Sequence, residues 1–256
     1  VLWAAENFSD LKKVRKAYRC STAFIYKVLF EQLKLNVSHK INYPWPKEIG
    51  IDEHFFTRRR GRAEFVTVFT DHTNKRLREV AFGKEKDALK YQLQNIKGRE
   101  NVQRVTLDMS DSYRSLVTEY FPNAKMIADK FHVLRLLTPA LIRTRKEIHG
   151  HRQELSLRRQ LLRSREKLDY FERCDLDRWL RVHPKLYELY RFKERLHALY
   201  RVRGIARARG ALEKLITEME ASKLEEVQRL RNTLNLWKNE VLEYFRARFT
   251  NAFNIA

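Results

Sequence analysis

Cysteine, proline and glycine are all scarce in this sequence of 256 residues, which contains 2 Cys, 5 Pro and 7 Gly. Two cysteines, Cys20 and Cys174, are too few for a disulfide framework or a cysteine-rich zinc module, and they indicate reduced thiols in a reducing cytoplasm. The low Gly and Pro content argues against a turn-rich β-sandwich and favours long helices. No apolar run approaches the ~20 residues of a membrane helix, so we expect no association with a membrane.

Positive charge, in contrast, is abundant. Lys and Arg number 53 against 32 Asp and Glu, which gives a formal net charge of +21. Hydrophobic residues make up 43% and aromatic residues 12% of the chain, enough to build a core and to exclude a disordered protein. A surplus of this size is typical of proteins that bind a polyanion, most often a nucleic acid.

Residues 1–46 are predicted to form a helix-turn-helix-like segment and a linker. Ser9 is expected to cap a first helix and Ser21 a second one, with a short break between them. Lys27 on the second helix is a candidate DNA contact. Many two-helix hairpins have the same pattern, so DNA recognition and plain packing both remain open. The prolines of residues 42–46 cannot continue a helix and predict a linker.

Residues 47–132 change from strand-like to alternating patterns. Three strands are expected to form an antiparallel meander, followed by helix, strand, helix and strand. The strands are predicted at 49–52, 63–70, 78–82, 102–107 and 125–128, and the helices at 84–96 and 110–120. The order βββαβαβ predicts an α/β core.

Residues 133–256 are predicted to be almost entirely helical and basic. From His132 to the end, 28 Lys and Arg face 16 Asp and Glu, a surplus of 12. A solvated helix face accounts for most of these charges, but a balanced face would serve solubility equally well. The surplus therefore still calls for an anionic partner.

Two acids, Asp52 and Asp108, each end a short apolar strand. If the fourth strand returns beside the first and parallel to it, both carboxylates project from the same sheet end, ~4.8 Å apart. A divalent cation between them would relieve their repulsion, as in a two-metal phosphoryl-transfer site. The alternative is that each Asp forms a turn or caps a helix.

Other residues are candidates for supporting roles. Asp129 and His132, at the end of the fifth strand, are expected to tune the metal, contact the scissile phosphate or replace a ligand. The alternative is a buried pair that orients the next helix. Glu53 should point to the face opposite Asp52 and is not expected to be a ligand. A basic turn carries four candidate phosphate contacts, with a solvated turn as the alternative. These are Arg58, Arg59, Arg60 and Arg62.

The sequence resembles the bacterial insertion-sequence transposases of the ISL-three family at five places. They are IGIDE at 49–53, LDMSDSY at 107–113, PNA at 122–124, ADKFHV at 128–133 and FTNA at 249–252. The resemblance covers residues 47–256 and, less specifically, the segment before them. It implies an α/β ribonuclease-H-like mixed sheet with a long α-helical insertion in residues 133–256.

The resemblance also implies the chemistry and the partners. Asp52 and Asp108 would be the first two acids of a DDE triad that binds two Mg²⁺ ions, with Mn²⁺ as a substitute and Asp129 as a candidate further ligand. The reaction would be DNA strand cleavage and transfer on double-stranded terminal repeats and target DNA. A homo-oligomer acting at the nucleoid of a bacterial cytoplasm is implied as well.

The third acid of the triad, a Glu, is expected a few residues beyond Thr250, where the sequence offers none. The family's upstream zinc-binding segment is also absent, and the chain opens on Val1. We therefore expect a transposase truncated at both ends, with Glu240 or Glu243 as weak stand-ins for the missing acid. A non-catalytic DNA-binding protein that competes for element ends, and a structural RNA-binding protein, remain alternatives.

Overall fold

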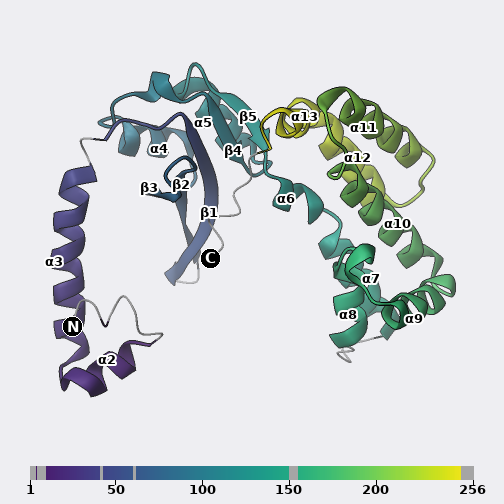
Figure 1. Ribbon diagram of the computed structural model, residues 1–256, viewed down its shortest axis with the longest axis horizontal. Coiled ribbons are helices and arrows are strands. Elements are labelled where there is room, and N and C mark those ends of the chain that lie inside the picture. Colours follow the sequence, from purple (N-terminus) through teal and green to yellow (C-terminus); the bar gives the residue numbers. More distant parts are fainter. Residues whose placement is uncertain (1–3, 5–9, 41–42, 60–61, 150–154, 249–256) are drawn as a thin grey trace.

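The computed structural model describes residues 4, 10–40, 43–59, 62–149 and 155–248. Its elements form an arch (Figure 1). Helices α2 (Leu11–Tyr18) and α3 (Thr22–Lys40) descend from one end of a five-stranded sheet, and a long helical region extends from the other. In the described part of the chain, no helix is long and apolar enough to cross a membrane.

The N-terminal helices are joined by a tight turn in which Arg19 has a φ of 48°. Asp10, rather than the predicted Ser9, caps α2, since its carboxylate accepts a hydrogen bond from the Lys12 amide at 2.8 Å. Ser21 caps α3 as predicted, because its Oγ accepts from the Phe24 amide at 3.1 Å. A small core around Val14 and Ile25 joins the two helices.

The strands and helices of the sheet region follow one another along the chain in the predicted order βββαβαβ. Its strands are β1 (Glu48–Arg59), β2 (Arg62–Asp71), β3 (Arg76–Phe82), β4 (Arg104–Leu107) and β5 (Lys125–Ala128). They lie in the spatial order β3-β2-β1-β4-β5. The first three are antiparallel, whereas β4 pairs with β1 and β5 pairs with β4 in parallel. The predicted return of the fourth strand beside the first is confirmed.

Helices α4 (Lys86–Leu93) and α5 (Asp111–Tyr120) make the crossovers, with a short 3₁₀ turn at Arg99–Asn101 before β4. Trp45, predicted to lie in a linker, is instead a core residue with 1% of its surface exposed. Its indole ring packs edge-on against Phe69 and Phe121, at centroid distances of 5.5 and 5.1 Å. The prolines on both sides end the helix, but the aromatic ring between them anchors the chain to the sheet.

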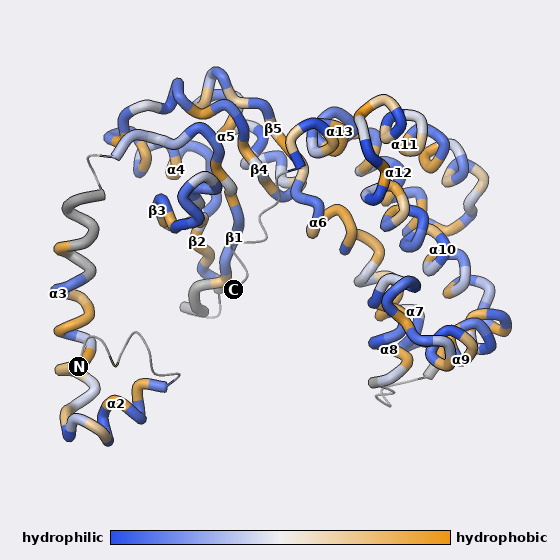
Figure 2. The backbone as a smooth tube through the Cα atoms, viewed as in Figure 1, coloured by the Kyte–Doolittle hydropathy of each residue, from blue (hydrophilic) through white to orange (hydrophobic). Residues whose placement is uncertain are grey.

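The rest of the chain is helical, and its helices alternate hydrophilic and hydrophobic residues (Figure 2). After α6 (Lys130–Leu134) come α7 (Thr138–His149), α8 (Leu155–Leu162), a 3₁₀ turn at Arg165–Lys167, α9 (Tyr170–Arg181), α10 (Pro184–Leu199), α11 (Ile205–Glu220), α12 (Glu225–Leu236) and α13 (Lys238–Ala247). Their buried apolar residues continue the core of the sheet without a break.

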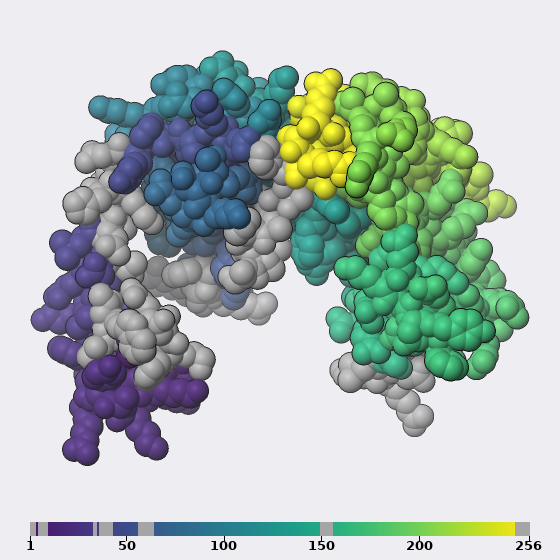
Figure 3. Space-filling model, viewed as in Figure 1, coloured from purple at the N-terminus to yellow at the C-terminus, as the bar shows by residue number. Residues whose placement is uncertain are grey.

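Helix α13 joins the helical region to the sheet, because it packs against β5. The space-filling view shows α13 between the sheet and the other helices (Figure 3). Arg114 of α5 fastens this joint: its guanidinium lies 3.6 Å from the centroid of the Trp237 ring and 2.9 Å from the Glu240 carboxylate. It also donates to the carbonyl of Leu236 at 3.0 Å. The end of the helical region is thus held beside the strand that precedes Asp129.

Candidate active site

The register of the parallel strands places three aspartates at the same level of the sheet. Ile51 of β1 pairs with Leu107 of β4, and Leu107 pairs with Ala128 of β5. The residue that follows each of them is an aspartate. Side chains alternate between faces along a strand, so residues in parallel register share a face. Asp52, Asp108 and Asp129 are therefore brought together at one level of three neighbouring strands. Asp108 and Asp129 directly follow β4 and β5, whereas β1 continues past Asp52 to Arg59, so the prediction that Asp52 ends its strand is wrong.

Of Asp52 and Asp108, the second has the more strongly perturbed pKa. Burial raises the pKa of its carboxyl to about 6; the positive charge of His132 acts against this shift, and the negative charges of Asp52 and Glu53 add to it. Its Oδ1 atom is buried and has no hydrogen-bond partner among the described residues. A buried carboxylate oxygen without a donor is costly unless another group, such as a cation, satisfies it.

Asp52 shows the same trend in a milder form. Burial raises the pKa of its carboxyl, while His132 and the Glu53 amide, which donates to Oδ1 at 2.9 Å, lower it. The charge of Asp129 raises the same pKa further. The electrostatic coupling of Asp52 to both Asp129 and His132 agrees with the common level of the three aspartates.

Asp129 and His132 form a pair at the start of α6. The Asp129 carboxylate, 1% exposed, caps α6 by accepting from the His132 amide at 3.3 Å, and it lies 3.1 Å from His132 Nδ1. This hydrogen bond raises the pKa of the His132 imidazole, against the effect of burial. The pair therefore orients the helix and places a readily protonated ring beside Asp52 and Asp108.

The chemistry of this donor set fits a hard divalent cation. Carboxylate oxygens are the ligands that Mg²⁺ prefers, and a cation would counter the burial that disfavours the ionised forms of Asp52 and Asp108. In the described ranges, no group of three or more His, Cys, Asp or Glu side chains is arranged to hold a metal ion. Asp52 and Asp108 are therefore not part of such a group within the described ranges.

The remaining sequence candidates lie apart from the acids or outside the described residues. Arg58, Arg59 and Arg62 belong to the β1–β2 hairpin beyond the acids, and Arg60 lies outside the described residues. Lys27 is exposed on α3. The third acid is expected a few residues beyond Thr250. Residues 249–256 are outside the described part as well.

The two weak stand-ins for the third acid are engaged elsewhere. Glu240 pairs with Arg114 at 2.9 Å, and Glu243 pairs with Arg246 at 3.4 Å. Both are mostly buried on α13, with 13% and 17% of their side chains exposed. Their ion pairs give each a structural role in this helix.

Sequence reasoning missed two neighbours of the site. Lys84, directly after the positive-φ Gly83, pairs with Glu53 at 3.6 Å and lowers the pKa of Asp108. Tyr200, at the end of α10, is buried near Asp129, whose charge helps burial to raise the pKa of the phenol. No local sequence motif marks either residue, because tertiary packing alone brings each of them close to the aspartates.

The strand order and the acids that share one level of the sheet define an α/β protein with a ribonuclease-H-like mixed sheet. A family model described as a transposase, that of the DDE transposases of the ISL-three (ISL3) family, matches residues 49–254. The chain belongs to this family, as the sequence motifs predicted. No curated protein matches the chain.

Proposed function

We propose that this chain takes part in Mg²⁺-dependent cleavage and transfer of DNA strands at the ends of an insertion sequence. The observation that carries the proposal is the pairing of Ile51 with Leu107, which sets Asp52, within β1, level with Asp108, the residue directly after β4. The transposase family of the chain supports a DNA substrate.

Asp52 and Asp108 would hold the divalent ions. Bound ions of this kind activate an attacking water or 3′ hydroxyl and stabilise the leaving oxygen. Asp129 fixes the ring of His132, whose raised pKa favours a positive charge next to the carboxylates. That charge would attract a phosphate group to the acidic site.

The parts of the chain would share the work. Residues 1–46 would bind DNA, residues 47–132 would carry the chemistry, and residues 133–256 would hold DNA by its phosphates. The net charge of +21 supports contact with a long polyanion. Because two DNA ends must be joined to a target, we propose a homo-oligomer as the working form.

The experiment is a nicking assay on duplex DNA that carries the sequences flanking the gene for this chain. We expect nicks that require Mg²⁺ or Mn²⁺ and disappear in the Asp52→Asn and Asp108→Asn variants, while Asp111→Asn, an exposed neighbour on α5, keeps the wild-type rate. Metal-dependent nicking that survives both site substitutions would disprove the assignment.

A second function is favoured because no group of three or more His, Cys, Asp or Glu side chains among the described residues is arranged to hold a metal ion. The chain would then bind element ends without cutting them and compete with a complete transposase. Binding to the flanking duplex with no metal-dependent nicking would support this function over the first.

A further inference from the structure

A groove lies along α10 in the helical region. It has a volume of about 740 Å³ and is lined by residues of α9, α10 and the 3₁₀ turn before α9. Five arginines but only three acids line it, so its walls are basic. A second hollow, about 460 Å³ in volume, continues it through the shared residues Asp177 and Tyr187.

The acids of this groove are already engaged by other groups. Asp177 forms two hydrogen bonds of 2.6 Å with the guanidinium of Arg165. Glu194 accepts from the backbone amide of Arg165 at 3.1 Å and lies 2.6 Å from Lys193 Nζ. Glu166 pairs with Arg201 at 3.2 Å. These contacts hold the groove in shape and neutralise the acids locally.

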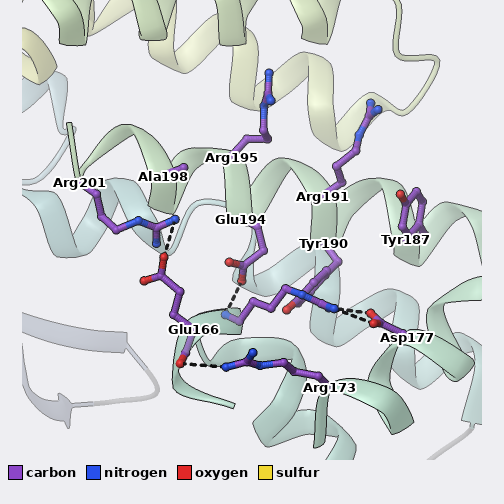
Figure 4. Close-up of a pocket in the computed structure, with 11 residues that line it drawn as sticks. Glu166, Arg173, Asp177, Tyr187, Tyr190, Arg191, Glu194, Arg195, Ala198 and Arg201 are labelled. Carbon is purple, nitrogen blue, oxygen red and sulfur yellow. Dashed lines mark hydrogen bonds and ion pairs between the residues drawn. The ribbon is translucent and has the colours of Figure 1, made fainter. Parts of the chain in front are cut away.

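Two of its arginines have no acidic partner in the described ranges. Arg173 donates only to the carbonyls of Leu168, at 2.9 Å, and Glu166, at 3.4 Å. Arg191 has only the ring of Phe192, 4.8 Å from its guanidinium carbon. Both are exposed. Figure 4 shows Arg191 and Arg195 extending to the same side of α10, whereas the Glu194 carboxylate points to the other side.

The groove also has a direction with respect to the candidate active site. Arg201, at one end of the groove, follows Tyr200. Tyr200 lies near Asp129, whose charge raises the pKa of the Tyr200 phenol. Tyr187, at the other end, lies near the start of α10. The helix has 16 residues, a length of about 24 Å, which matches about seven base pairs of DNA.

We propose that this α10 groove binds the phosphodiester backbone of duplex DNA that continues outward from the aspartates of the candidate active site. The inference rests on the proposed function and names the surface that would hold its substrate. Guanidinium groups without an acidic partner are suited to phosphate oxygens, which they bind with two parallel hydrogen bonds. The groove would thereby set the direction in which the duplex leaves the site.

The test measures binding of a fluorescent 30-base-pair duplex by anisotropy at several salt concentrations. The Arg173→Gln/Arg191→Gln variant should bind several-fold more weakly at low salt. The slope of log K against log salt should fall by about 1.8, since each lost phosphate contact contributes about 0.9. The Arg173→Lys/Arg191→Lys variant should recover most of the slope.

The matched control is Arg207→Gln/Arg209→Gln, which removes two exposed charges from α11 outside the groove. Equal losses of slope in both double variants would overturn the proposal, because binding would then depend on total charge alone. Stronger competition by duplex RNA than by DNA, or full competition by millimolar inorganic phosphate, would also overturn it. The proposed cleavage is tested separately, since Asp52→Asn should abolish nicking and leave the slope unchanged.

Discussion

The sheet and the helical region hold their charges in opposite ways. At the strand ends, Asp129 is buried and Asp108 is half-buried, and loss of solvation raises the pKa of Asp108 to about 6. Along α8 to α12, arginines and acids pair at the surface, as Arg229 and Glu225 do with 66% and 74% of their side chains exposed. The sheet gathers a few poorly solvated charges at one place, whereas the helices spread many well-solvated charges over a wide surface.

The difference teaches where each function can be located. Buried acids depend on the register between strands that are far apart in the sequence, so a small shift would separate them. Exposed ion pairs of the helical region, whether within one helix or between two, each contribute little, and single losses should be tolerated. We therefore expect chemistry to be sensitive to single substitutions in the sheet and DNA binding to decline gradually with charge in the helices.

The largest effect should come from Trp45→Ala, which empties a buried site between the sheet and α5. We expect the free energy of unfolding to fall by about 3–5 kcal/mol, the usual loss for a large buried aromatic. Urea denaturation measures it. Tyr43→Ala, at a ring that is 51% exposed, is the control and should change stability little; equal losses would refute the core role of Trp45.

The next largest loss of stability should come from a substitution at the joint between the sheet and the helical region. Arg114→Ala removes the stack on Trp237 and the ion pair with Glu240, so we expect a loss of about 2–3 kcal/mol. Calorimetry should then show the sheet and the helical region unfolding in separate transitions. Arg99→Ala, whose guanidinium carbon lies 5.7 Å from the ring of Tyr120, should leave a single transition. A single transition in both variants would contradict the role of Arg114 as the joint.

Substitution of Asp108 in the candidate active site should have a smaller effect on the free energy of unfolding, and one of opposite sign. Because the native pKa of Asp108 is about 6 and its ordinary value is 3.8, the native chain binds more protons between these values. Stability contributed by this carboxyl therefore falls as pH rises from about 4 to 6. In EDTA, Asp108→Asn should stabilise the chain by about 1–2 kcal/mol at pH 7.5, with no gain near pH 3.5. If Asp108→Asn instead lowered the free energy of unfolding at pH 7.5, burial of the Asp108 carboxylate would not be destabilising.

The smallest effect should be found on the helical surface. Glu225→Gln breaks an exposed pair one turn apart on α12, and such pairs contribute little to stability. We expect thermal unfolding to change by no more than the error of the measurement. A clear loss would show that the surface charges of the helical region are coupled, contrary to the contrast drawn with the sheet.

Much of the sheet was predictable because its signals are local. The predicted strand at 125–128 coincides with β5, and the order of elements was confirmed. The pairing of Asp52 with Asp108 followed from the handedness of crossover connections. In contrast, β1 runs on to Arg59, beyond the predicted end at 52, since its hairpin with β2 extends past the edge of β4.

The rest depended on tertiary contacts that leave no local pattern. Trp45 was assigned to a linker because its neighbours are prolines, yet its ring fills the core. Lys84 and Tyr200 reach the site from the end of β3 and the end of α10. The α10 groove arises only when helices that are separate in sequence pack together, although the surplus of basic residues already indicated an anionic partner.

The most direct test of a shared metal site is a titration with Mn²⁺ followed by electron paramagnetic resonance, on the wild-type chain, Asp52→Asn, Asp108→Asn and the double variant. If both carboxylates hold the same ions, either single substitution should weaken binding nearly as much as both together. Losses that simply add, or Mn²⁺ binding that neither substitution weakens, would contradict a site built by the two aspartates in common.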